Sequence, residues 1–145
     1  MKGASTSSAG SEKTMSNDWC FGCGKHNPIG LKLTFAEEDG VSIARFTPRA
    51  EHQSYDGTIH GGIISTLLDE VMGRYLYVNK GRNVATAKLE VRFRKPTPVG
   101  QELTIRGWVV KERGKLIETA GTVALADGTV TAESHAMLMD AGKRE

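Results

Sequence analysis

Cysteine, proline and aromatic residues are scarce in this chain. Its 145 residues include 2 cysteines, 4 prolines and 6% aromatic side chains. Two cysteines cannot build the disulfide framework of a small secreted domain, and no apolar signal-peptide core is visible, so we expect a cytoplasmic protein. Long apolar runs are also missing, because charged residues interrupt each one well before the roughly 20 residues that a membrane span needs. We therefore expect no membrane association.

An excess of charge of one sign is absent as well. Lys and Arg number 19 and Asp and Glu number 17, and the net charge of +2 is spread along the chain. Domains that bind nucleic acid usually gather their basic residues into a patch. The charge pattern therefore excludes nucleic acid as the expected partner and suits a protein that acts on a small molecule.

The length is sufficient for one domain with its own apolar core, since a chain of this size buries about two-thirds of its unfolded surface. Residues 1–17 are mostly Ser, Thr, Gly, Ala and Lys without an apolar period. Such a segment cannot bury enough surface to become ordered, so we expect a disordered tail or an expression scar there. We place the domain at residues 18–140 and a short C-terminal tail at 141–145.

Hydrophobic periodicity predicts one long helix and several strands. Apolar residues recur at helical spacing from Ile63 to Leu76. Alternation of apolar and polar residues predicts strands at 31–35, 41–46, 85–94, 103–111, 116–126 and 129–139. Because no crossover pattern is visible, we expect an α+β hotdog fold, in which an antiparallel sheet of five to six strands wraps around one long central helix.

The polar face of the predicted helix has an unusual composition. It carries small residues and one carboxylate instead of the usual Lys, Glu and Gln: Gly62, Ser65, Thr66, Asp69 and Gly73. We interpret this face as one that a second chain or a ligand approaches closely, although a simple helix-packing groove explains it equally well. For Glu70 and Arg74, four residues apart at the margin of the apolar face, we expect a surface ion pair without a chemical role.

The start of the helix favours the binding of a carbonyl oxygen. The first amide groups of a helix have no partner within it, and the glycines at Gly61 and Gly62 leave them accessible. Such amides and the positive end of the helix stabilise an oxyanion. Asp69 lies about 12 Å further along the same helix. Two helices packed antiparallel across a two-fold axis would bring both groups to one bond.

Three segments resemble a known family. The helix segment 60–73, HGGIISTLLDEVMG, is similar to the helix motif of hotdog-fold acyl-CoA thioesterases of the PaaI-like group. The segment 20–31, CFGCGKHNPIGL, resembles the N-terminal part of one branch of that family, and the segment 85–100 fits its following strand. Together these segments cover most of Trp19 to Met139.

The resemblance implies hydrolysis of an acyl-CoA thioester, without a cofactor or metal, in a site shared by two subunits of a homodimer or of a tetramer formed from two dimers. Asp69 corresponds to the catalytic carboxylate, as general base or nucleophile. Gly61 corresponds to the backbone donor to the thioester carbonyl, and Thr86, on the polar face of its strand, to a hydroxyl that helps to place the water. We expect His60 mainly to hold the start of the helix.

Substrate contacts are expected at His60, at Gly62 and at Ser54. Some relatives carry an amide side chain where this chain has Ser54, and Gln53 supplies that amide if the loop is shifted by one residue. Two alternative functions stay open. One is a non-catalytic module that binds or senses an acyl-CoA on the same fold. The other is a hotdog dehydratase, for which His60 is the sole candidate base.

Other reactive residues have weaker patterns. Cys20 and Cys23, with His26 three residues further on, have a spacing compatible with zinc or redox chemistry. Three ligands are one short of a closed zinc site, so we favour a structural loop. A basic group at Arg92, Arg94 and Lys95 suits either the phosphates of CoA or a solvated strand face. For the single histidines His52 and His135 we expect structural roles.

Overall fold

The computed structural model describes residues 18–143, so the expected tail at 1–17 lies outside the described residues. One α-helix and six strands make up most of this part of the chain. The elements are β1 (Ala36–Glu38), β2 (Val41–Phe46), α1 (Gly61–Lys80), β3 (Arg82–Phe93), β4 (Leu103–Arg113), β5 (Leu116–Ala124) and β6 (Val130–Lys143), with a short 3-10 turn at Ala50–His52. The last strand thus continues three residues beyond the expected end of the domain.

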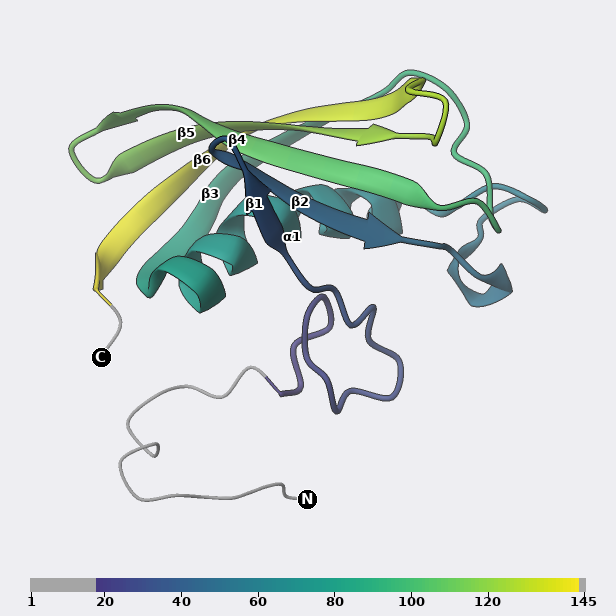
Figure 1. Cartoon of the computed structure of the whole chain (residues 1–145), viewed down its shortest axis with the longest axis horizontal. Helices are drawn as coiled ribbons and strands as arrows, with labels where there is room; N and C mark the ends of the chain where they lie inside the picture. The colour runs from purple at the N-terminus through teal and green to yellow at the C-terminus, as the bar shows by residue number, and fades with distance from the viewer. Residues whose placement is uncertain (1–17, 144–145) are drawn as a thin grey trace.

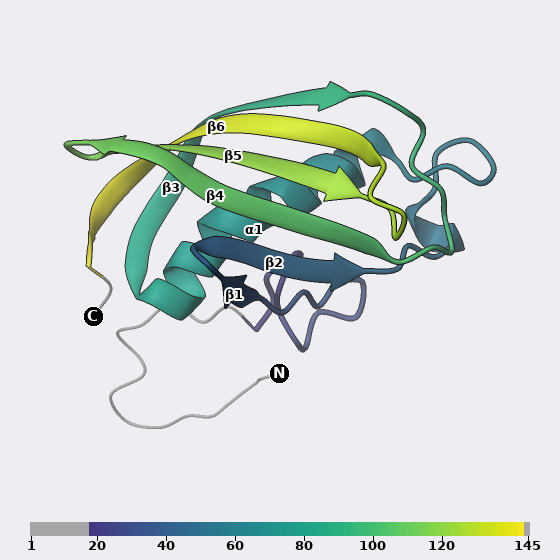
Figure 2. The same cartoon turned by 45° about the horizontal axis from the view of Figure 1, so that its top comes forward.

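The strands form one sheet in the order β1-β2-β4-β5-β6-β3, and every neighbouring pair is antiparallel. The sheet curves over α1, which runs across its concave face (Figures 1 and 2). This arrangement confirms the predicted α+β hotdog fold. Its order leaves β3, a strand of 12 residues, at one edge of the sheet.

The helix is held against the sheet by its apolar side. Its buried side chains, among them Leu67, Val71 and Met72, meet sheet residues such as Leu103 and Ile105 in a single core. The contact is close because β4 has a glycine beneath the helix: a Cβ at Gly107 would lie 2.7 Å from Val71 Cγ1. The helix ends at Lys80 and is capped by Gly81, whose φ of 65° is the left-handed conformation that glycine adopts without strain.

The strand predicted at 31–35 is not formed, although its alternation is real. Leu31 and Leu33 are buried in the core, but Lys32 between them has a φ of 57°, which no regular strand allows. The amide groups of Leu31 and Leu33 donate to the carbonyls of Phe21 and Gly22, at 2.8 and 2.9 Å. The segment therefore pairs with the preceding loop and places two leucines in the core without extending the sheet.

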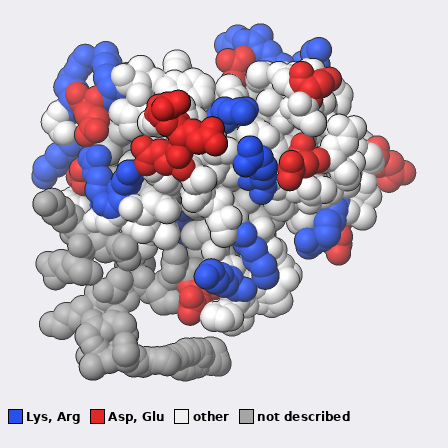
Figure 3. All heavy atoms as spheres, viewed as in Figure 1, with Lys and Arg blue, Asp and Glu red and all other residues white. Residues whose placement is uncertain are grey.

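Charged side chains of both signs are interspersed over the face of the molecule shown in Figure 3, without a broad area of either sign. No helix among residues 18–143 is both long and apolar enough to cross a bilayer.

Candidate functional site

The structure brings two of the predicted site residues into direct contact. Asp69 lies on α1 and Thr86 on the edge strand β3, and Thr86 Oγ1 donates a hydrogen bond of 2.6 Å to Asp69 Oδ1. The Asp69 side chain is half-buried and Thr86 is exposed, so the pair is open to solvent in the single chain. One turn further along the helix, Gly73 faces the same hydroxyl: a Cβ there would lie 3.8 Å from Thr86 Oγ1. The pair therefore lies on the small-residue face of the helix.

Thr86 reaches Asp69 because β3 contains a bulge. Simple alternation groups Thr86 with Lys88, Glu90 and Arg92 on the polar face of the strand, but the Thr86 side chain lies on the helix side, in contact with Asp69. The pairing of β3 with β6 shifts between Thr86 and Lys88, and Thr86 lies opposite the buried Leu138. An extra residue in one strand reverses which face the following side chains occupy. The bulge thus turns Thr86 toward α1.

The start of α1 leaves one amide group open. His60 caps the helix: its Nδ1 accepts a hydrogen bond of 2.8 Å from the Gly62 amide, and its carbonyl accepts from the amides of Ile63 and Ile64. Within residues 18–143 the Gly61 amide has no hydrogen-bond partner. Of the two glycines, Gly61 is therefore the donor available to a carbonyl oxygen, while the amide of Gly62 is occupied by the cap.

The loop before the helix holds Ser54 and Gln53. Ser54 Oγ is 3.5 Å from the carbonyl of Thr58, and Gln53 Oε1 accepts a hydrogen bond of 3.0 Å from the Gly57 amide. Both side chains thus make contacts inside their own loop. Neither of them contacts Asp69 or Thr86 in the described chain.

The two halves of the predicted site stay apart within one chain. Gly61 and Asp69 are eight positions apart, which corresponds to about 12 Å along the helix axis. Strand β3 runs back along this face from Thr86, beside Asp69, to Phe93, whose ring would lie 3.3 Å from a Cβ at Gly61. The unpaired edge of the sheet therefore borders both the carboxylate and the open amide.

Glu70 and Arg74 form the ion pair that their spacing predicts, but Glu70 is buried, so the pair does not lie at the open surface. The Glu70 side chain is 11% exposed, and its Oε1 lies 3.9 Å from Arg74 Nε and 3.9 Å from the Sγ of Cys20. Burial, together with the negative charge of Cys20, raises the pKa of Glu70 to about 8. The N-terminal loop folds over this side of the helix, which periodicity within the helix cannot reveal.

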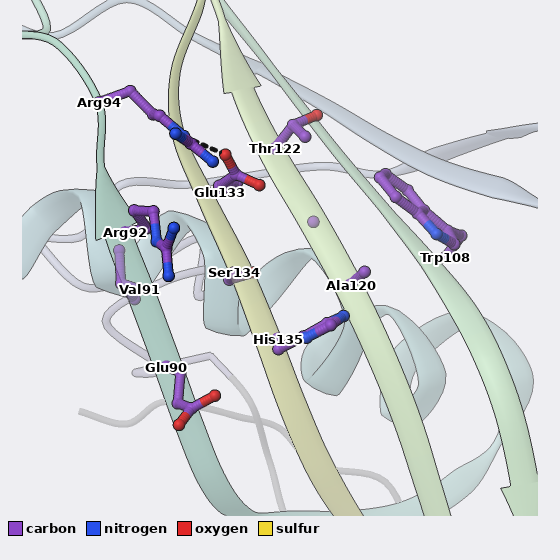
Figure 4. Close-up of a pocket in the computed structure, with 11 residues that line it drawn as sticks. Glu90, Val91, Arg92, Arg94, Trp108, Ala120, Thr122, Glu133, Ser134 and His135 are labelled. Carbon is purple, nitrogen blue, oxygen red and sulfur yellow. Dashed lines mark hydrogen bonds and ion pairs between the residues drawn. The ribbon is translucent and has the colours of Figure 1, made fainter.

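Two members of the basic group at the end of β3, Arg92 and Arg94, face away from the helix. Figure 4 shows a hollow on the outer side of the sheet, where Arg92, Arg94, His135 and Trp108 lie with the helix ribbon behind them. Arg94 forms an ion pair with Glu133, drawn as a dashed line. The hollow is therefore on the opposite side of the sheet from Asp69 and Thr86.

His52 and His26 make contacts with neighbouring residues of their own segments. His52 is buried against Phe46, and its Nδ1 accepts a hydrogen bond of 2.9 Å from the Arg49 amide. His26 is exposed and lies 3.4 Å from Asp18.

Comparison with known proteins places these features in a family. The model of the thioesterase superfamily matches residues 56–132, which is more than half of the chain and includes α1, Asp69 and Thr86. None of the curated proteins matches the chain. Solved structures do match the chain.

The thioesterase superfamily protein RHA08564 superposes with a TM-score of 0.77 and 29% identity over 85% of this chain. This chain spans 61% of the length of that relative. The smu.793 protein of Streptococcus mutans, crystallised with acetyl CoA, has a TM-score of 0.70 and 24% identity, covering 78% of this chain and 91% of its own. PaaI of E. coli, from the phenylacetic acid degradation operon, has a TM-score of 0.71 and 16% identity, covering 79% and 83%. The chain therefore belongs to the thioesterase superfamily and has its hotdog fold.

Proposed function

We propose that this protein hydrolyses the thioester bond of an acyl-CoA, with Asp69 as the catalytic carboxylate. The observation that carries the proposal is the hydrogen bond of 2.6 Å from Thr86 to Asp69, on a helix face of small residues beside an open sheet edge. A hydroxyl that occupies one carboxylate oxygen orients the group and leaves the second oxygen for a water molecule or for the thioester carbon. Family membership and the acetyl CoA bound by the Streptococcus mutans relative support the substrate class.

In this mechanism Asp69 accepts a proton from a water molecule, which attacks the thioester carbonyl carbon. Alternatively, the carboxylate attacks that carbon itself and water then cleaves the anhydride. In both routes negative charge develops on the carbonyl oxygen, and an amide donor at a helix N-terminus stabilises that charge. The Gly61 amide is the donor available for it. The CoA thiolate leaves and the free acid forms.

The complete site requires a second subunit in this proposal, because Gly61 and Asp69 of one helix lie too far apart to contact the same carbonyl group. Two β3 edges can pair in antiparallel orientation about a two-fold axis, which removes the exposed edge of each sheet. Because β3 runs from the Thr86 end to the Phe93 end, antiparallel pairing places the Thr86 end of one strand beside the Phe93 end of the other. Since Phe93 marks the Gly61 end of the helix, this pairing brings the partner's open amide toward Asp69.

A thiol-release assay tests the activity. Short, medium, long and aromatic acyl-CoAs are offered to the purified protein, and free CoA is measured. We expect Asp69→Asn to lose on the order of 10²- to 10⁴-fold in kcat, as the loss of a general base typically does. Asp39→Asn, in an exposed turn between β1 and β2, is the matched control and should keep the parental rate.

Near-parental hydrolysis by Asp69→Asn would refute the role of this carboxylate. If no acyl-CoA is hydrolysed but one binds, the chain is a binding or sensing module on the same fold. Calorimetric titration with the same acyl-CoAs distinguishes that outcome.

A further inference from the structure

A cluster of reactive side chains lies outside the proposed thioesterase site. The Sγ atoms of Cys20 and Cys23 and a carboxylate oxygen of Glu70 all lie within 4.8 Å of one another. The Arg74 Nε donates a hydrogen bond of 3.1 Å to Cys20 Sγ. Both cysteines are free and partly accessible, whereas Glu70 is buried.

Two glycines make this cluster possible. The loop turns back on itself at Gly24, whose amide donates a hydrogen bond of 2.8 Å to the Cys20 carbonyl, and a Cβ at Gly24 would collide with the backbone of Cys20. A Cβ at Gly22 would collide with the carboxyl group of Glu70. The turn thus brings the thiols together and presses them against α1. The two Sγ atoms lie within 4.8 Å of each other, and rotation of the two side chains is the movement that shortens this separation to the S–S bond length of about 2.05 Å.

The surroundings of the two thiols differ. Burial opposes ionisation of Cys20, but hydrogen bonds from the Cys23 backbone and from Arg74 outweigh it and lower the pKa of Cys20. Burial and the neighbouring Cys20 raise the pKa of Cys23 to about 12. Cys20 is therefore the thiol of the pair that ionises more readily. A nucleophilic thiolate beside a second thiol is the arrangement from which a disulfide forms through a sulfenic acid.

A metal ion suits this cluster less well. Only three ligand atoms converge among the described residues, and His26, the further ligand that sequence spacing offers, is exposed beside Asp18. The guanidinium of Arg74 already supplies positive charge next to Cys20 and Glu70, and a divalent cation would have to lie beside it. The geometry favours chemistry of the thiols themselves.

We propose that Cys20 and Cys23 form a redox-active dithiol, which hydrogen peroxide oxidises to an intramolecular disulfide and a dithiol reductant restores. The Cys20 thiol gives its proton to the Glu70 carboxylate, 3.9 Å away. The resulting thiolate attacks one peroxide oxygen, the O–O bond breaks, and the leaving hydroxide takes that proton from Glu70 to form water. Cys23 gives its proton to the Glu70 carboxylate and attacks the sulfur of the Cys20 sulfenic acid. The hydroxide released from that sulfur takes the proton as a second water. Two thiols and one peroxide thus yield one disulfide and two waters.

Thiol counting and intact mass spectrometry test this proposal on the full chain. After treatment with stoichiometric hydrogen peroxide, we expect both thiols to disappear with the loss of two hydrogen atoms from one chain, and dithiothreitol to restore them. Cys23→Ser should stop at a sulfenic acid on Cys20 that dimedone traps. Because this readout does not involve thioester hydrolysis, its result is independent of the proposed function.

The role of Arg74 is tested by the pH dependence of thiol alkylation. Arg74→Gln should move the alkylation profile of Cys20 toward that of an ordinary thiol and slow its oxidation about tenfold, since a charged hydrogen bond to the thiolate is lost. Arg45→Gln, on the exposed face of β2, is the matched control and should leave the alkylation profile and the oxidation rate unchanged.

Two results would overturn the proposal. One is purified protein that holds stoichiometric zinc on unreactive thiols, and the other is oxidation only to a disulfide between two chains. Peptide mapping of the oxidised wild-type chain distinguishes a Cys20–Cys23 disulfide within one chain from a disulfide between two chains, even where a variant fails to fold.

Discussion

Asp69 and Thr86 show how much depends on a single side-chain contact. The carboxylate is oriented by one hydroxyl from the neighbouring strand, and that hydroxyl faces the helix only because of the bulge after Thr86. Neither residue stands out by burial, since both are accessible in the single chain. In the proposal, their chemical role comes from the hydrogen bond between them and from the second subunit that pairs with the edge of the sheet.

Replacing Thr86 tests this pairing. Thr86→Val keeps the shape of the side chain and removes the donor, so we expect kcat to fall about 10- to 100-fold, the range set by one hydrogen bond to a charged group. Thr86→Ser keeps the hydroxyl and should retain most of the rate. Steady-state kinetics with a preferred acyl-CoA measure both, and thermal unfolding verifies the fold. Equal rates for the Val and Ser variants would exclude a role for this hydroxyl.

At the scale of elements, α1 presents different chemistry on its different sides. Its apolar side fills the core, its small-residue side carries Asp69, and a third side buries Glu70 under the N-terminal loop. Asp69 and Glu70 are adjacent in sequence, yet Glu70 is buried and Asp69 only half-buried, and burial raises the pKa of Glu70 to about 8. Because the loop buries Glu70 against the helix, the stability of the whole domain depends on the ionisation of that residue.

The buried Glu70 makes stability depend on pH. Its pKa is about 8 in the folded chain against an ordinary value of 4.5, and Cys20, Arg74 and Asp69 are the charged groups that act on it. Between these values the folded chain binds more protons than the unfolded chain, so the free energy of unfolding falls as pH rises from about 5 to 8. The effect is on the order of a few kcal/mol.

Urea unfolding at a series of pH values measures this dependence. We expect Glu70→Gln to reduce the decline of the free energy of unfolding with rising pH, because a neutral amide has no proton to lose. Glu38→Gln, exposed on β1, should leave the decline unchanged. A decline of the same size in Glu70→Gln would assign the pH dependence to other groups.

For the whole molecule, the proposed dimer explains three features together. They are the unpaired edge of β3, the small-residue face of α1, and the distance between the open Gly61 amide and the Asp69 carboxylate. Sedimentation equilibrium separates a dimer from a tetramer built of two dimers. Either assembly completes the site if it contains the β3 pairing.

Mixing two inactive variants tests the shared site. Gly61→Pro removes the open amide while proline is well tolerated at the first helical position, and Asp69→Asn removes the carboxylate. After the two variants are unfolded and refolded together, random pairing gives mixed dimers with one intact site, and we expect about a quarter of the parental activity to return. Gly61→Ala, which keeps the amide and meets the same Phe93 ring, should stay active. A site contained within one chain would show no recovery.

The sequence by itself determined the elements and the family. Spacing of 3.6 residues and of two residues reports which side chains are buried, so the helix and most strands were predictable, and the helix segment around Asp69 pointed to thioesterases. Tertiary structure decided what depends on contacts between distant segments. The bulge that turns Thr86 to Asp69, the failure of residues 31–35 to form a strand, and the burial of Glu70 under Cys20 all arise where two elements meet. Periodicity within one element carries no information about its neighbour, so these contacts appear only when the chain is folded.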